Sequence, residues 1–201
     1  RREFIKALQK NESINLGIFD DIYPDEAHFI YELLQNCEDA GATEATISLD
    51  EAGCIFRHNG TRRFTADDVD AITGINNSTK ADQEEKIGKF GIGFKSVFVY
   101  TTTPRIRSGD ISFQITDYFV PELIEHDPKI GDETIFEFPF NNPSKNPADA
   151  YREIALGFEE LNKNTLLFLK ELKSVVWKID NRERGFLKKR YNSANHIEIV
   201  R

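Results

Sequence analysis

Three polar residues in the segment ELLQNCEDAG are spaced so that they could act together: Glu32, Asn36 and Asp39. On a helix with 3.6 residues per turn they fall within an arc of roughly 60°, so they form one ridge. The apolar residues of the helix expected at residues 25–40 share its opposite side: Ala27, Ile30, Leu33, Leu34 and Cys37. The ridge is either a solvated face or the polar side of a site. Asparagine favours a site, because it competes for backbone hydrogen bonds and is a poor choice for a merely solvated position.

A glycine-rich segment, GKFGIGFKS at residues 88–96, supplies the anion-binding groups that a site at this ridge would need. Glycines let backbone N–H groups approach an anion closely, and a helix that begins there adds the positive end of its dipole. Lys89 and Lys95 add charge. The segment is not a Walker A loop, because Phe94 separates Gly93 from Lys95, and it is not a G-x-G-x-x-G dinucleotide loop. It predicts phosphate binding; the alternative is that the glycines serve tight helix–sheet packing.

Together the two segments resemble the GHKL ATPase superfamily, which includes gyrase, heat-shock protein 90, histidine kinases and MutL. The first motif of the family, E-x-x-x-N-x-x-D-A, is matched by Glu32, Asn36, Asp39 and Ala40. Its glycine-rich motif, G-x-x-G-x-G, is matched by Gly88, Gly91 and Gly93. The segments HFIYELLQNCEDA, FRHNG and IGKFGIGFKSVF further resemble the sacsin-like branch, whose nucleotide domains look like that of heat-shock protein 90. The resemblance covers about residues 20–140.

The resemblance implies ATP and Mg²⁺ as ligands and gives each matched residue a role. Asn36 would bind Mg²⁺ through its amide oxygen, and a hard cation that keeps several waters suits such a ligand. Glu32 would orient and deprotonate the attacking water, while Asp39 and Ala40 would line the nucleotide side of the helix. The phosphates would be held by Gly88, Lys89, Phe90, Gly91, Ile92, Gly93, Phe94 and Lys95. The segment that covers the nucleotide in relatives would include Ser78, Thr79 and Lys80.

This chain departs from the pattern of the family in one motif. The second motif is D-x-G-x-G, whose aspartate accepts a hydrogen bond from the adenine amino group, whereas this chain has RHNGTRRF and retains only Gly60. Either His58 or Asn59 stands in place of the aspartate. We favour Asn59, because its amide oxygen can still accept from adenine, though more weakly than a carboxylate. The alternative for both residues is a strand end followed by a turn.

The pattern of elements predicts an α+β fold. Two strands, TEATISLD and GCIFRHNG, follow the helix of residues 25–40, and TADDVDAITGI forms a short helix capped by Thr65. Further strands are expected at RIRSG, ISFQITDYF, TIFEFPF, SVVWKID and HIEIV, and an amphipathic helix at residues 148–163. The resemblance implies a Bergerat-type sandwich, with a mixed, mostly antiparallel sheet covered on one face by helices. We expect one domain, residues 1–201, with a nucleotide-binding core to residue 140 and an extension from residue 141, as a fragment of a longer protein.

Composition narrows the function classes. The net charge of −8 argues against broad nucleic-acid binding, which needs a basic footprint. Two cysteines, Cys37 and Cys54, are too few for a disulfide framework, which favours a reducing, cytoplasmic location. No apolar run approaches the roughly 20 residues that a membrane span needs.

Three functions compete. The first is a slow Mg²⁺-dependent ATPase that acts as a conformational switch in a chaperone-like or other sacsin-like protein, with ATP and ADP, downstream domains and a second copy as partners. The second is a nucleotide-binding or structural module without turnover. The third, a histidine kinase, is disfavoured by Glu32, because those kinases generally lack a carboxylate at this position.

Overall fold

The computed structural model describes residues 29–74, 92–193 and 196–201, which form a single nine-stranded sheet in the order β5-β4-β3-β6-β2-β1-β7-β8-β9. The strands are β1 Glu44–Asp50, β2 Gly53–His58, β3 Arg105–Ser108, β4 Ile111–Thr116, β5 Val120–Leu123, β6 Thr134–Pro139, β7 Ser174–Ile179, β8 Arg182–Ser193 and β9 His196–Val200. Neighbouring strands pair antiparallel, except β1 and β7, which run parallel.

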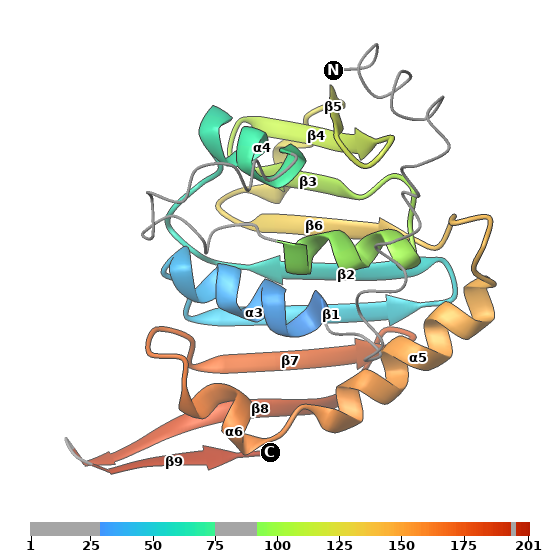
Figure 1. The fold of residues 1–201 in the computed structure, drawn as a ribbon. Helices are drawn as coiled ribbons and strands as arrows, with labels where there is room; N and C mark the ends of the chain where they lie inside the picture. Colours follow the sequence, from blue (N-terminus) through green and yellow to red (C-terminus); the bar gives the residue numbers. More distant parts are fainter. Residues whose placement is uncertain (1–28, 75–91, 194–195) are drawn as a thin grey trace, which may run out of the picture.

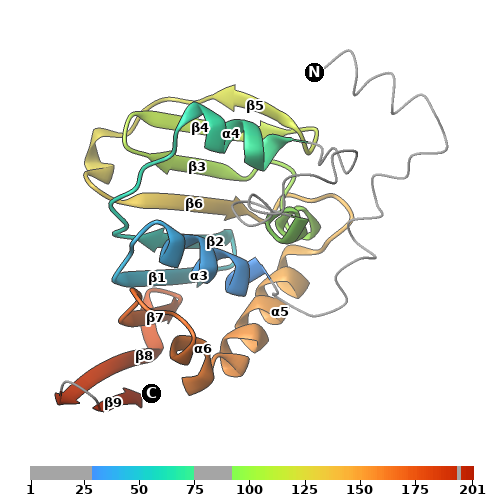
Figure 2. The ribbon, with the colours of Figure 1, turned by 60° about the vertical axis from the view of Figure 1, so that its left-hand side comes forward.

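The α-helices lie on one face of this sheet (Figures 1 and 2). They are α3 Phe29–Asp39, α4 Ala66–Thr73, α5 Pro147–Glu160 and α6 Lys163–Leu167, and the 3₁₀ helices are η1 Ile92–Val99 and η2 Pro128–Ile130. The arrangement confirms the predicted α+β class and its mostly antiparallel sheet. Within the described ranges, no helix is long and apolar enough to cross a membrane.

Apolar alternation explains how the central strands meet the helices. In β2 the side chains of Cys54, Phe56 and His58 are buried, whereas the residues between them are half-exposed. A strand has a two-residue period, so these three side chains share the face that the helices cover. The hairpin that joins β1 to β2 is closed by Asp50, whose Oδ1 accepts the N–H groups of Ala52 at 2.8 Å and Gly53 at 3.1 Å.

An aromatic cluster fixes α3 and η1 on the sheet. Phe29 of α3 packs edge-on against Phe138 of β6, with ring centroids 5.4 Å apart. Phe94 of η1 contacts Phe136 and Phe138, each at 6.2 Å. Burying a phenylalanine side chain stabilises a fold by about 1.5–3 kcal/mol, so these contacts hold both helices firmly in register with the central strands.

The boundaries of α3 and α4 follow ordinary capping chemistry. α3 ends at Gly41, which has a φ of 70° and lets the N–H of Ala42 reach the carbonyl of Cys37. α4 begins with a capping box, in which Thr65 and Asp68 exchange side-chain and backbone hydrogen bonds. Both helices therefore end or begin where the sequence predicts.

The residues after 140 continue the same sheet, because β7 pairs with β1 and β8 and β9 follow at its outer edge. The sequence LLFLKEL does not extend α5; Asn162 caps a separate helix, α6. β5 and β8 were not among the predicted strands. The sequence also predicts a helix at residues 1–16, a helix cap at Asp25 and a polar loop before Gly88; these residues lie outside the described part of the chain.

Candidate functional site

The ridge of α3 is not a uniformly solvated face. Asp39 is exposed and Glu32 is half-buried, but the side chain of Asn36 retains only 7% exposure. The amide atom of Asn36 assigned as Nδ2 is fully buried and has no hydrogen-bond partner among the described residues. Leaving a buried amide group unpaired costs free energy, so the position calls for a partner beyond those that residues 29–74, 92–193 and 196–201 provide.

The start of η1 lies directly against this ridge. A Cβ built on Gly93 would stand 2.1 Å from Cδ and 2.6 Å from Oε1 of Glu32. No side chain fits at such distances, so glycine at position 93 allows the backbone of the glycine-rich segment to touch the carboxylate. The structure therefore brings together two residues that the sequence assigned to separate motifs.

A narrow pocket, about 10 Å³ in volume, opens beside Asn36. Its walls come from α3, the end of β2, the segment after β2, α4 and the start of β6. The lining residues are Asn36, Ala40, His58, Arg62, Arg63, Phe64, Asp68, Thr134 and Phe136. This volume is about that of one water molecule, so the pocket in this conformation is too small for a purine. Arg62 is the exposed side chain among its lining residues.

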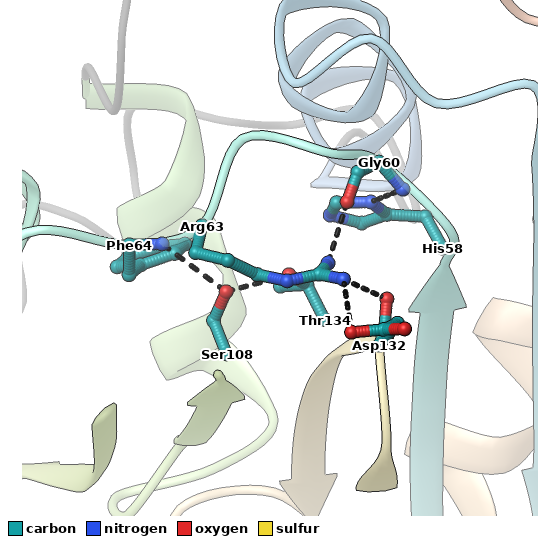
Figure 3. A network of polar contacts seen from close by, with 7 residues as sticks. All are labelled: His58, Gly60, Arg63, Phe64, Ser108, Asp132 and Thr134. Atoms are coloured by element: carbon teal, nitrogen blue, oxygen red, sulfur yellow. Dashed lines mark hydrogen bonds and ion pairs between the residues drawn. The ribbon is translucent and has the colours of Figure 1, made fainter. Parts of the chain in front are cut away.

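His58 faces this pocket with a defined tautomer. The backbone N–H of Gly60 donates to Nδ1 at 3.1 Å (Figure 3), so in the neutral ring the proton is assigned to Nε2. Burial, and to a smaller extent the positive charge of Arg63, lowers the pKa of His58 to about 4. The imidazole is therefore neutral at physiological pH. A Cβ on Gly60 would lie 2.9 Å from the Cβ of Ala40, so this glycine lets the turn pack onto α3.

A polar network holds the segment after β2 in place (Figure 3). The Arg63 guanidinium donates to the carbonyls of Gly60 and Asp132 and pairs with the Asp132 carboxylate at 3.5 Å. The Ser108 hydroxyl accepts the N–H of Phe64 at 3.1 Å and shares a 2.7 Å hydrogen bond with the hydroxyl of Thr134. The pocket wall is therefore tied to β3 and β6.

Asn59, the residue favoured from sequence as the adenine contact, points elsewhere. Its Oδ1 accepts the N–H groups of Thr43 and Glu44, both at 2.9 Å, and its Nδ2 donates to the Thr43 hydroxyl at 3.0 Å. The side chain is exposed and does not line the pocket. Of the two candidates, the structure places His58 in the pocket and uses Asn59 to fasten the start of β1.

Lys95, assigned from sequence to the phosphates, is turned into the protein. Its ammonium donates to the carbonyls of Ile72 at 3.3 Å and Tyr118 at 3.4 Å, and it lies 4.4 Å from the centroid of the Phe119 ring. Burial lowers the pKa of Lys95 to about 8. In this structure Lys95 braces η1 against α4 and the β4–β5 turn rather than facing the pocket.

Several predicted site residues fall outside the described part of the chain: Ser78, Thr79, Lys80, Gly88, Lys89, Phe90 and Gly91. Ile92 begins η1, and Phe94 belongs to the core with 1% exposure. Phe94 therefore supports the segment through packing.

Sequence reasoning missed the residues of β6 that line the pocket, Thr134 and Phe136. Thr134 is the cross-strand partner of both His58 and Ser108, so the three residues form one row across β2, β6 and β3. Their positions could have identified them from the sequence, since each is a polar residue at the end of an otherwise apolar strand face.

Other features of the described residues point less directly to a function than the pocket beside Asn36 does. A cavity of about 580 Å³ lies between α5 and strands β7 and β8, away from the ridge. Across residues 29–74, 92–193 and 196–201, no group of three or more histidine, cysteine or acidic side chains could hold a metal ion.

The geometry thus defines an α+β domain with one polar pocket between a helix ridge and the sheet. Residues 53–146 match the sequence model of the Sacsin domain. Human sacsin is 37% identical over 105 residues, which cover 44% of this chain and 2% of sacsin. Protein NO VEIN of Arabidopsis thaliana is 28% identical over 185 residues, which cover 79% of this chain and 7% of that protein. The sacsin-like part of the resemblance is therefore confirmed, and the chain spans only a small part of either relative.

Among solved structures, the crystal structure of the N-terminal domain of a DNA repair protein has a similar fold. The TM-score is 0.53 at 14% sequence identity, over 87% of this chain and 55% of that chain. At this identity the similarity concerns the fold alone.

Proposed function

We propose that this chain is a Bergerat-type, GHKL-like domain that binds ATP with Mg²⁺, hydrolyses it slowly and acts as a nucleotide-driven switch in a larger sacsin-like protein. One observation carries the proposal. Along α3 and the residue that follows it, Glu32 lies against Gly93, Asn36 lines the pocket and Ala40 lies against Gly60. Eight residues of helix span about 12 Å, enough to place phosphates at the Glu32 end and a base at the Ala40 end.

The residues at the middle of the ridge suit a magnesium nucleotide. Asn36 would offer its amide oxygen to Mg²⁺, and the buried, unpartnered end of the same amide supports a ligand at this point. Mg²⁺ is usually held by one or two protein oxygens together with phosphates and water, which agrees with the lack of a carboxylate cluster in the described ranges. When bound, the ion would neutralise charge on the phosphates.

Glu32 is the group that would make the site hydrolytic. Its carboxylate is half-buried, one helical turn from Asn36, and touches the start of η1. A carboxylate within hydrogen-bond reach of a water can accept its proton as the water attacks. The contact with Gly93 would hold the carboxylate in one orientation, since the backbone there leaves it little room.

A binding module without turnover is the second candidate. The narrow pocket and the missing aspartate of the second motif favour it. The two candidates share the nucleotide and differ only in what Glu32 does. In either case, ATP and ADP, further domains of the longer protein and a second copy on ATP binding are the partners that we propose.

Calorimetry with Mg²⁺ and ATP tests the binding step. We expect binding by the parent chain, a loss of at least tenfold in Asn36→Ala, and unchanged affinity in Gln35→Ala, a neighbouring exposed position outside the ridge. No binding by a folded parent chain would refute the proposal. Phosphate release by the full-length protein and its Glu32→Ala variant then decides between the candidates: turnover abolished by the substitution supports the ATPase, and binding without turnover supports the module.

A further inference from the structure

The two edges of the nine-stranded sheet differ in how well they could accept a further strand. β5, at one edge, contains Pro121, which has no N–H group to donate to a neighbouring strand. β9, at the other edge, has the sequence HIEIV, with three β-branched residues and neither proline nor lysine. Within the described part of the chain β9 pairs only with β8, so the backbone groups along its outer side have no strand to bond. The β9 edge is therefore the better template for another strand.

An apolar patch lies beside this edge. Within residues 29–74, 92–193 and 196–201, six large apolar side chains are exposed, and four of them belong to α6, the residue after it and the β8–β9 hairpin. They are Leu167 at 63% exposure, Phe168 at 82%, Tyr191 at 55% and Ile197 at 52%. α6 lies next to β8 and β9 in both views (Figures 1 and 2). Exposed apolar side chains that gather in one place on a soluble domain are typical of contact with another protein.

The register of the hairpin places Tyr191 and Ile197 where the cover by α6 ends. Leu187, Lys189 and Tyr191 share one face of β8, because alternate residues of a strand point the same way. Leu187 and Lys189 are buried, and the ammonium of Lys189 donates to the carbonyl of Leu169, just after α6. Tyr191 is the next residue on this face and pairs across to Ile197. A strand added to β9 would therefore place its side chains on this face against Ile197.

The opposite face of the hairpin is basic. Lys188 and Arg190 are exposed there, at the positions that alternate with Lys189 and Tyr191. Residues 182–201 contain six lysine and arginine residues and two glutamates, whereas the whole chain has a net charge of −8. Exposed charges act on one another over a Debye length of about 8–10 Å, which exceeds the spacing between neighbouring strands. The β9 edge therefore favours an acidic partner.

The same charge disfavours a second copy of this chain as the partner. Two β9 strands paired edge to edge would bring two basic hairpins together, and like charges across an interface cost affinity. A nucleic acid would satisfy the charge, but it has no peptide groups to pair with the backbone of an edge strand. An extended acidic peptide satisfies both requirements.

We propose that β9 and the patch of Leu167, Phe168, Tyr191 and Ile197 bind an extended acidic segment of another protein, which adds to the sheet as a new edge strand. Such a segment alternates, with apolar residues on the face that carries α6 and aspartate or glutamate on the opposite face. Main-chain hydrogen bonds supply affinity, and the alternation supplies selectivity. β1, β7 and β8 separate this edge from β2, which lines the pocket beside Asn36, so the docking is independent of the nucleotide.

Fluorescence anisotropy tests the proposal with a fluorescein-labelled peptide of about eight alternating valine and glutamate residues, the length of an ordinary strand. The 201-residue chain should bind it about tenfold or more tighter than the same peptide with lysine in place of glutamate. Proline at two central valine positions removes N–H groups and should weaken binding by about tenfold or more. If the glutamate peptide bound no better than the lysine or the proline peptide, the proposal would be wrong.

Substitutions locate the binding surface. Ile197→Ser removes part of the patch and Arg190→Glu reverses a charge on the opposite face, so each should weaken the glutamate peptide about fivefold or more. Leu123→Ser at the β5 edge and Lys129→Glu in η2 are the matched controls, because both side chains are exposed and neither lies on the hairpin. The controls should bind within about twofold of the parent. Thermal unfolding confirms that each variant folds, and equal losses in test and control variants would contradict the proposal.

Two further measurements detect the other partners. Sedimentation measures self-association, and a dimer that Ile197→Ser abolishes would overturn the proposal in favour of a second copy. Labelled oligothymidylate probes nucleic acid, and its binding to a chain that does not bind the glutamate peptide would overturn the proposal in favour of an anionic polymer. A monomeric chain that binds the glutamate peptide, with losses in Ile197→Ser and Arg190→Glu alone, supports the docking of an acidic strand.

Discussion

The carboxylate of Glu32 lies so close to Gly93 that a Cβ at position 93 would stand 2.1 Å from Cδ and 2.3 Å from Cγ of the glutamate. All three nearest atoms belong to the side chain of Glu32, so a Cβ at position 93 would require the glutamate to leave its present conformation or the start of η1 to shift. The contact joins α3 to η1, which are separated along the chain by the strands β1 and β2 and by the helix α4. The ridge of α3 and the end of the glycine-rich segment are therefore in direct contact.

The first prediction follows from this contact. Gly93→Ala should displace either the Glu32 carboxylate or the start of η1, at a cost of about 1–3 kcal/mol in the free energy of unfolding. If Glu32 is the base of a slow ATPase, a displacement of this size should also lower the rate of phosphate release about tenfold or more. Urea unfolding and a phosphate-release assay measure the two effects.

A double-mutant cycle provides the control. Glu32→Ala removes the atoms that the new Cβ would strike, so Gly93→Ala should cost less stability in that background, with a coupling of at least about 0.5 kcal/mol. Equal costs in both backgrounds would show that the strain at position 93 arises from another neighbour.

Much of this site could be predicted from the sequence because it depends on local periodicity. The spacing of Glu32 and Asn36 places them on one ridge of any α-helix, and Thr65 is recognisable as a helix cap. The burial of Asn36 could not be predicted in the same way, because it depends on how closely the end of β2 approaches α3. That distance is set by the contact between Gly60 and Ala40.

The structure separates His58 from Asn59 for a reason visible in the sequence. The two-residue period of β2 continues from Cys54 through Phe56 to His58, so His58 points toward the helices and Asn59 points away. Lys95 gave no such signal, because its orientation depends on η1 forming a 3₁₀ helix. β5 contains Pro121 and β8 is rich in charge, so neither has the regular apolar alternation that identifies a strand.

The second prediction concerns Asn59. Asn59→Ala removes three hydrogen bonds, including the acceptor for the N–H groups of Thr43 and Glu44, and should lower the free energy of unfolding by about 1–2 kcal/mol. Because the side chain lies outside the pocket, calorimetry should show an affinity for ATP within about twofold of the parental value. A loss of ATP affinity as large as that of Asn36→Ala in a folded variant would return Asn59 to the role predicted from sequence.

The third prediction is a pH dependence. The folded-state pKa of His58, about 4, lies below the ordinary value of 6.5, so the unfolded chain binds the proton more readily. The contribution of His58 to stability is therefore complete above about pH 6.5 and is lost as the pH falls toward 4. A shift of this size corresponds to roughly 3 kcal/mol.

Urea unfolding of the parent and of His58→Asn between pH 4 and 8 isolates this contribution. The difference in stability between the two proteins should be constant above about pH 7 and should shrink as the pH falls. A difference that does not change with pH would mean that His58 titrates normally in the folded protein.

The last prediction concerns the other side of α3. Glu38 accepts three backbone N–H groups from the segment between α6 and β7: those of Lys170, Glu171 and Leu172, the last at 2.8 Å. A carboxylate that holds three donors in a connecting segment ties α3, and with it the ridge, to the strand β7. Glu38→Ala should therefore lower the free energy of unfolding by about 2–3 kcal/mol, because hydrogen bonds to a charged group are among the stronger ones.

The single tryptophan, Trp177, lies in β7 with 4% exposure, so its fluorescence reports unfolding of this part of the sheet directly. Gln35→Ala is the matched control, since Gln35 is exposed on the same helix and should change stability by less than about 0.5 kcal/mol. Glu38→Gln keeps one oxygen acceptor, so its free energy of unfolding should lie between those of Glu38→Ala and Gln35→Ala. If Glu38→Ala were as stable as Gln35→Ala, the three N–H groups would be satisfied equally well by water, and α3 and β7 would be joined by packing alone.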